Sequence, residues 1–125
     1  MKVRIVLVDD DAECSRALGE LLAAEGFDPL AFESGEGAWC AISSDQIRPD
    51  VVVTDIRMPG LDGMALLRRI KCRFPAMPVV LLSAFADEEV WAEGLRAGAF
   101  DVFPKPIPCA ALVRALYSAV GMGRA

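Results

Sequence analysis

The chain has 125 residues, of which 54% are hydrophobic and 25% charged, so it has enough apolar side chains for the core of one ordinary domain. Its net charge of −5, without a run of basic residues, argues against nucleic-acid binding, and no apolar stretch approaches the roughly 20 residues that span a membrane. The first residues do not have the pattern of a signal peptide. We therefore expect one domain over residues 1–125, located in the cytoplasm.

Short β-branched apolar runs recur along the chain, each followed by a turn and an amphipathic helical pattern. The runs predict strands at residues 3–8, 30–32, 51–54, 79–82 and 101–103. The first, third and fourth runs are almost continuously apolar, which is typical of central strands that helices cover on both faces. The second run follows Pro29, which cannot donate to a strand ladder, so we expect it at an edge of the sheet.

Polar capping residues and glycines mark the ends of five expected helices. The helices are predicted to start after Asp11, Ser34, Asp62-Gly63 and Pro108, and the fourth is predicted to start near residues 87–89. The first should end at Gly26 and the fourth at Gly98. The predicted core face of the first helix consists of Cys14, Leu18, Leu21 and Leu22.

The four cysteines, Cys14, Cys40, Cys72 and Cys109, are scattered without any C-x-x-C pair. No histidine is present to complete a zinc site, so we interpret the cysteines as buried, small apolar residues of the helices. The absence of histidine also means that this chain has no catalytic histidine and is not itself a phosphohistidine donor.

Alternating strands and helices with short connections indicate an α/β fold with right-handed crossovers. We predict a doubly wound, five-stranded parallel sheet of order 2-1-3-4-5, flanked by five helices, as in flavodoxin-like folds. In this order the ligand crevice opens between the first and third strands. The first strand brings Asp9 and Asp10 to that crevice, and the third brings Asp55.

Three clustered carboxylates require compensating positive charge, because two like charges about 4 Å apart repel by roughly 4 kcal/mol at an effective dielectric constant of 20. Lys105, after the fifth strand, supplies one charge, and a Mg²⁺ ion would balance the remaining two. The ion and Lys105 would also offset the negative charge on the oxygens of a phosphoryl group, so that a carboxylate could attack its phosphorus atom. Asp55 is the candidate nucleophile. Ser83, at the end of the fourth strand, is placed to donate a hydrogen bond to a phosphoryl oxygen.

Four stretches in order, VLVDDD, VVVTDIRMPGLDG, PVVLLSA and AGAFDVFPKP, resemble the receiver domain of bacterial two-component response regulators over essentially the full chain. The resemblance implies a phosphoacceptor role for Asp55, direct Mg²⁺ binding by Asp10 and water-mediated binding by Asp9. It also implies metal coordination by the backbone carbonyl of Arg57, a switch role for Ser83 and pairing of Lys105 with the phosphoryl group. The Lys105-Pro106 bond resembles the cis peptide of this family.

One position departs from the family pattern. The switch aromatic residue normally lies three residues before the lysine, where this chain has Val102, followed by Phe103. The coupled rotation of hydroxyl and aromatic side chains is therefore expected to be absent or altered, whereas phosphorylation does not require it. Trp91 either fills the groove between the fourth helix and the sheet or, with Val102, belongs to a partner surface formed by the fourth helix, fifth strand and fifth helix.

Simpler interpretations exist for several of these residues. Asp11 is best read as a helix cap, and Asp9, Ser83 and Lys105 could be ordinary capping, turn or surface residues. A phosphatase of the dehalogenase type would need a second aspartate two residues after its nucleophile, where this chain has Arg57. A nucleotide-binding module would need a glycine-rich loop where the chain has DDDAEC. A receiver-like docking module that is never phosphorylated remains an alternative.

The expected function is therefore that of a receiver domain, not an enzyme in its own right, that controls an output domain or a downstream protein. Asp55 would accept a phosphoryl group from a sensor histidine kinase in a Mg²⁺-dependent reaction. The resemblance further implies a homodimer through the face of the fourth helix, fifth strand and fifth helix. No direct contact with nucleic acid or membrane is expected.

Overall fold

The structure is a computed structural model that describes residues 2–84 and 88–121. The strands are β1 (Arg4–Val8), β2 (Asp28–Phe32), β3 (Val51–Asp55), β4 (Val79–Ser83) and β5 (Asp101–Pro104). The helices are α1 (Ala12–Ala24), α2 (Gly35–Ser43), α3 (Gly63–Arg73), α4 (Glu88–Arg96) and α5 (Cys109–Gly121). None of these helices is long and apolar enough to cross a bilayer, as far as the described residues extend.

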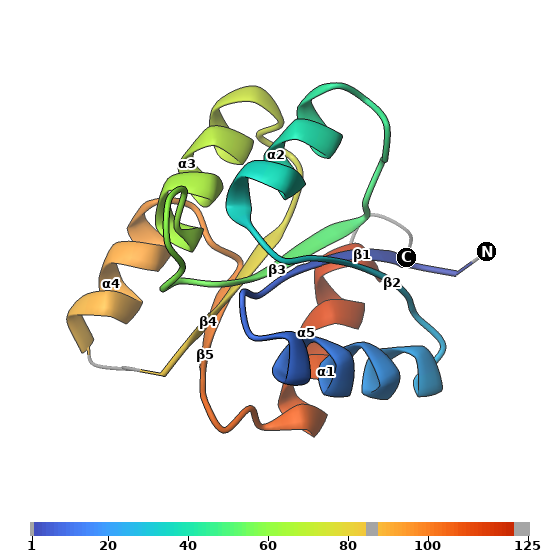
Figure 1. The fold of residues 1–125 in the computed structure, drawn as a ribbon. Coiled ribbons are helices and arrows are strands. Elements are labelled where there is room, and N and C mark those ends of the chain that lie inside the picture. The colour runs from blue at the N-terminus through green and yellow to red at the C-terminus, as the bar shows by residue number, and fades with distance from the viewer. Residues whose placement is uncertain (1, 85–87, 122–125) are drawn as a thin grey trace.

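All the strands pair in parallel in the order β2-β1-β3-β4-β5, which confirms the predicted topology. Helices α1 and α5 cover one face of the sheet, and α2, α3 and α4 cover the other (Figure 1). Strands β1, β3 and β4 are central, as their continuous apolar runs indicated, and their last four residues are all buried. The shorter second run forms the edge strand β2, whose residues are only partly covered.

Successive residues of each strand point to opposite faces, so the two helical layers have separate cores. Val102 and Phe103 of β5 illustrate this alternation. Val102 is 1% exposed and packs in the layer of α4, whereas Phe103 belongs to the layer of α1 and α5. The suggestion that Val102 contributes to a partner surface is therefore wrong, because the pleat of β5 turns this side chain inward.

The predicted caps of the first two helices are confirmed, whereas the third helix begins at Gly63 itself rather than after it. The Asp11 carboxylate accepts hydrogen bonds from the backbone amides of Glu13 and Cys14, at 3.0 and 3.3 Å, and the bond from Cys14 lowers the pKa of Asp11. Ser34 caps α2 and Asp62 caps α3 in the same way. Helix α4 begins at Glu88 among the described residues, and residue 87, included in the predicted start, lies outside them.

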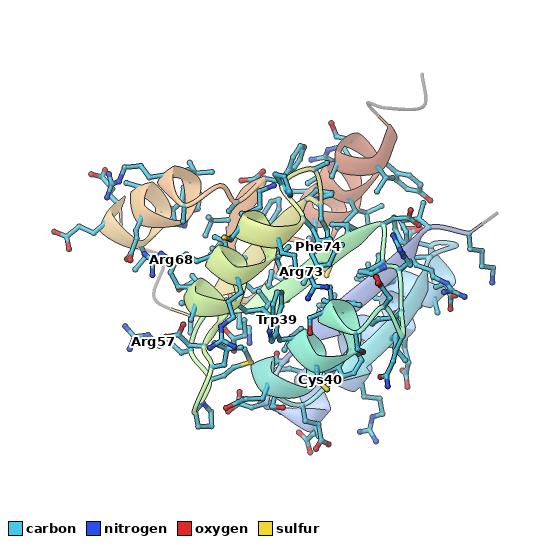
Figure 2. All side chains as sticks on the ribbon, turned by 90° about the horizontal axis from the view of Figure 1, so that it is seen from above. Trp39, Cys40, Arg57, Arg68, Arg73 and Phe74 are labelled. Atoms are coloured by element: carbon cyan, nitrogen blue, oxygen red, sulfur yellow. The ribbon has the colours of Figure 1, made fainter. Side chains whose placement is uncertain are left out.

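The prediction that the cysteines are buried is wrong, since Cys14, Cys40, Cys72 and Cys109 are all exposed free thiols. The reason is the helical phase. In α1 the buried residues are Ser15, Leu18 and Leu22, whose common direction lies roughly 70° around the helix from Cys14, so Cys14 lies at the edge of the core stripe. Cys40, labelled on α2 in Figure 2, is likewise exposed. Each helix turns only one stripe toward the sheet, and the cysteines fall beside it.

Gly63 allows α3 to start directly against the end of β3. A Cβ atom at this position would overlap with the carbonyl oxygen of Asp55 and lie 2.8 Å from the Cα of Ile56. We expect Gly63→Ala to lower the free energy of unfolding by about 2 kcal/mol, since overpacking a close contact costs 1–3 kcal/mol. Urea unfolding followed by circular dichroism measures this change.

Gly19 offers the matched control within a helix. A Cβ at Gly19 would meet nothing within 4 Å, so Gly19→Ala should raise the free energy of unfolding by up to about 1 kcal/mol through helix propensity. Equal effects of the two substitutions would show that the close approach of α3 to Asp55 has no energetic importance.

Candidate functional site

Three carboxylates converge at the carboxyl ends of β1 and β3. Asp9 and Asp10 directly follow β1, and Asp55 is the last residue of β3, which pairs with β1 up to Val8 and Thr54. The carboxylate oxygens of these three aspartates lie within 4.8 Å of one another. Asp9 and Asp55 are 2% and 8% exposed, whereas Asp10 is open to solvent. The predicted convergence of the first and third strands is confirmed.

Lys105 reaches the same cluster from the segment after β5. Its ammonium group donates hydrogen bonds to Oδ2 of Asp9 and Oδ2 of Asp55, each at 3.1 Å. Its backbone amide donates to the carbonyl oxygen of Ser83 at 2.9 Å, and the Lys105-Pro106 peptide bond is cis, as in the family that the sequence resembles. One lysine thus bridges the two buried carboxylates.

The two neighbouring aspartates after β1 have different environments. Both carboxylate oxygens of Asp9 are engaged, since Oδ1 accepts a hydrogen bond from the backbone amide of Asp11 at 2.9 Å and Oδ2 accepts from Lys105. Asp10 is exposed and belongs to the cluster of oxygens. A cation that entered the cluster from solvent would therefore reach Asp10 more readily than Asp9, whose oxygens both accept hydrogen bonds.

The cluster perturbs the titration of its members. Burial raises the pKa of Asp55, although the hydrogen bond from Lys105 opposes this shift. Burial alone would lower the pKa of Lys105, but the hydrogen bonds to Asp55 and Asp9 outweigh it and raise that pKa. The folded state therefore disfavours the ionised form of Asp55, whereas it stabilises the charged form of Lys105.

The raised pKa of Asp55 gives a stability prediction in Mg²⁺-free buffer. The folded state binds a proton at Asp55 more readily than the unfolded state, so ionised Asp55 destabilises the fold at neutral pH and less so as the pH falls through its folded pKa. We expect Asp55→Asn to raise the free energy of unfolding at pH 7, by an amount that shrinks toward pH 4. Chemical denaturation of the wild type and Asp55→Asn between pH 7 and pH 4 measures this difference. A difference in the free energy of unfolding that grows on acidification would contradict the prediction.

Ser83 and Arg57 lie beside a polar cavity of about 370 Å³ between α3 and α4. Ser83 is 1% exposed at the end of β4, while Arg57 is exposed on the β3–α3 loop. Arg68 of α3 and Glu93 of α4 also line the cavity and form an ion pair at 2.9 Å. In Figure 2, Arg57 extends from the loop before α3 and Arg68 extends from α3 itself, both on the side of α4.

The donor set suits a hard cation. In octahedral Mg²⁺ coordination, two oxygens on opposite sides of the ion are roughly 4.2 Å apart, twice the usual Mg–O distance of about 2.1 Å. Carboxylate oxygens of Asp9, Asp10 and Asp55 within 4.8 Å of one another need only small side-chain adjustments to reach this spacing. Three carboxylates and one ammonium group carry a formal charge of −2, which one divalent cation neutralises. These aspartates could therefore hold a metal ion.

The comparison with protein families agrees with this geometry. Residues 5–117 match the family described as the response regulator receiver domain. The chain belongs to this family. It is a receiver domain with an acidic phosphorylation site, a phosphoacceptor signalling module of two-component systems.

Among known proteins, the chain is similar to the DNA-binding transcriptional regulator NtrC of Salmonella typhimurium, with 42% identity over 100 residues, covering 80% of this chain and 21% of NtrC. It is also similar to the C4-dicarboxylate transport transcriptional regulatory protein DctD of Rhizobium meliloti, with 34% identity over 88% of this chain and 24% of DctD. The chain thus spans about a fifth to a quarter of the length of these relatives.

Solved receiver domains have the same fold along nearly the whole chain. The receiver domain of the Francisella response regulator 1452 superimposes with a TM-score of 0.91 at 27% identity, covering 98% of this chain and 99% of that one. The BeF3-activated DrrB receiver domain gives a TM-score of 0.85 at 29% identity, covering 97% and 99%. The receiver fold predicted from the sequence is confirmed.

Sequence reasoning missed one residue beside this site. Glu36, in the first turn of α2, accepts a hydrogen bond from the backbone amide of Leu61 in the loop that follows β3. The two residues are 25 positions apart, and a glutamate in a first turn is already explained by the helix dipole. No local signal in the sequence therefore distinguishes this contact.

Proposed function

We propose that Asp55 is the phosphoacceptor of this receiver domain and that the reaction depends on Mg²⁺. The observation that carries the proposal is the cluster itself: three aspartates with oxygens within 4.8 Å, and an ammonium group 3.1 Å from two of them. Lys105 bonds one oxygen of Asp9 and one oxygen of Asp55, but the second oxygen of Asp9 already accepts from the backbone amide of Asp11, which favours Asp55. Its other carboxylate oxygen is the candidate nucleophile.

The phosphoryl donor in this proposal is a phosphohistidine of a separate sensor histidine kinase. An oxygen of Asp55 attacks the phosphorus atom, so that an O–P bond forms while the N–P bond to the donor imidazole breaks, and the imidazole takes up a proton. Lys105 offsets charge on the phosphoryl oxygens, and the Ser83 hydroxyl donates a hydrogen bond to one of them. Bound Mg²⁺ would neutralise negative charge on the transferred group.

The proposed Mg²⁺ ligands are the carboxylates of Asp10 and Asp55 and the backbone carbonyl of Arg57, with Asp9 acting through water. The environments of the two adjacent aspartates support this division. Asp9 is buried and both of its oxygens already accept hydrogen bonds, whereas Asp10 is exposed. Asp9, which is buried and has both oxygens bonded, is therefore suited to contact the ion through water, and exposed Asp10 is suited to bind it directly.

We also propose that residues 1–125 work as one receiver domain in the cytoplasm and transmit the signal to an output domain or a downstream protein. The relatives NtrC and DctD are transcriptional regulators several times longer than this chain, which supports an output partner. Trp91 and Leu95 of α4 are 39% and 50% exposed. Exposed apolar side chains on this helix support a contact or homodimer surface on the face formed by α4, β5 and α5.

Incubation with acetyl phosphate and Mg²⁺ tests the phosphoacceptor assignment. Intact-mass spectrometry should show a gain of one phosphoryl group that is stable in acid and lost in alkali, as expected for an acyl phosphate. Asp55→Asn should abolish this gain, whereas Asp45→Asn, an exposed aspartate outside the cluster, should leave it unchanged. A phosphoryl group that persists unchanged in Asp55→Asn would refute the assignment.

A further inference from the structure

The loop between β3 and α3 links Asp55 to the rest of the proposed metal site, and the sheet fixes only its base. The backbone amide of Ile56 donates to the carbonyl oxygen of Leu82 at 2.9 Å, and the amide of Gly63 donates to the carbonyl oxygen of Ile56 at 2.8 Å. These bonds close the loop at residues 56 and 63. Met58 is 7% exposed and packs into the core, which leaves the tip at residues 59–61 to be held from elsewhere.

Helix α2 holds the tip of this loop. The carboxylate of Glu36 accepts a hydrogen bond from the backbone amide of Leu61 at 3.1 Å. It lies so close to Gly60 that a Cβ there would overlap with the Glu36 carboxylate, and Gly60 has a φ of +74°, a conformation suited to glycine. A Cβ at Gly35 would in turn overlap with the carbonyl oxygen of Leu61. The first turn of α2 and the loop tip are therefore in direct backbone contact.

We propose that Glu36 is a positioning residue for the phosphorylation site. By holding Gly60 and Leu61, it restricts the segment that begins at Asp55 and contains the Arg57 carbonyl. Mg²⁺ requires near-ideal octahedral placement of its oxygen ligands, so a loop ordered in advance binds the ion without the entropic cost of ordering it. This inference rests on the proposed function, because it assigns Glu36 to the same site.

Two other roles for Glu36 must be distinguished from positioning. An acidic residue in a first turn stabilises its own helix through the dipole, and this effect would change stability but not Mg²⁺ affinity. A negative charge near the site would also attract a cation at long range. Glu36→Gln separates these possibilities, since glutamine keeps an oxygen that can accept from Leu61 but removes the charge.

The experiment measures Mg²⁺ affinity by isothermal titration calorimetry and exchange of the Leu61 amide by nuclear magnetic resonance. We expect Glu36→Ala to weaken Mg²⁺ binding about fivefold, the order expected for one ordinary intramolecular hydrogen bond, and to accelerate exchange at Leu61. Glu36→Gln should remain close to the wild type. Glu33→Ala removes an exposed carboxylate from the segment before α2 and should change neither measurement.

A double substitution sharpens the test. Gly60→Ala should displace the Glu36 carboxylate, so adding Glu36→Ala to Gly60→Ala should weaken Mg²⁺ binding less than Glu36→Ala does alone. Unchanged Mg²⁺ affinity in Glu36→Ala, or equal losses in Glu36→Ala and Glu36→Gln, would overturn the positioning role.

The outcomes also separate this inference from the proposed function. If the wild type takes up phosphate but Glu36→Ala binds Mg²⁺ and labels like the wild type, only the positioning role is wrong. If the wild type binds Mg²⁺ in a Glu36-dependent way but never takes up phosphate, the positioning role stands and the phosphoacceptor proposal fails.

Discussion

Replacing Lys105 with methionine should lower the free energy of unfolding of the Mg²⁺-free protein by about 3 kcal/mol, because removing one partner of a buried ion pair leaves uncompensated charge. Here the side chain of Lys105 is 19% exposed and those of Asp9 and Asp55 are 3% and 11% exposed. Loss of the ammonium group would leave two carboxylates facing each other in a largely dry site. Urea unfolding at pH 7 in the presence of a chelator measures the effect.

Two controls show whether the effect arises from this pairing. Arg114→Met removes an exposed cation of α5 and should change the free energy of unfolding by less than about 0.5 kcal/mol. Adding Asp55→Asn to Lys105→Met should raise the free energy of unfolding by more than Asp55→Asn does in the wild type, because it removes one of the two unpaired charges. If the double variant is as unstable as the sum of the single ones predicts, the ion pair is not the cause.

The pH dependence of this effect has a definite sign. The pKa of Lys105 is raised in the folded state, so its stabilising contribution is fully present below the unfolded pKa and is lost as the pH rises through the folded pKa. The difference in stability between the wild type and Lys105→Met should therefore persist at neutral pH and decrease in strongly alkaline buffer. An increase of the difference on raising the pH would contradict this account.

Saturation with Mg²⁺ should stabilise the wild type by a comparable amount. A ligand that binds only the folded state at 100 times its dissociation constant contributes about 2.7 kcal/mol. For a chain of this size the melting temperature should rise by roughly 10 °C. The physical reason is the net charge of −2 on the three aspartates and Lys105, which a divalent cation neutralises. Differential scanning calorimetry with and without Mg²⁺ measures the shift.

Asp10→Asn should remove most of this shift. Asp10 is exposed, so its replacement leaves no buried group unpaired, and the variant should fold normally without the ion. Sodium chloride at equal ionic strength is the control for screening of charge. A full Mg²⁺-dependent shift in Asp10→Asn, or an equal shift in sodium chloride, would show that the ion does not bind among these aspartates.

Much of the fold and of the site was predictable because it depends on local patterns. Continuous apolar runs placed β1, β3 and β4 in the centre of the sheet, and Pro29 placed β2 at its edge. Capping residues such as Asp11 and Ser34 marked the starts of helices. Once the strand order was inferred, the convergence of Asp9, Asp10 and Asp55 followed, since parallel strands end at the same edge of a sheet.

The sequence by itself therefore determined the topology and the residue types at the carboxyl edge of the sheet. The tertiary structure decided which groups pair there: Lys105 bonds to Asp9 and Asp55, and Glu36 holds the loop tip at Leu61. It also decided that the cysteines are exposed and that Val102 is turned inward. Strand and cap patterns act between near neighbours, whereas these contacts join residues distant in the chain and depend on helical phase and strand pleat, which only the packed structure fixes.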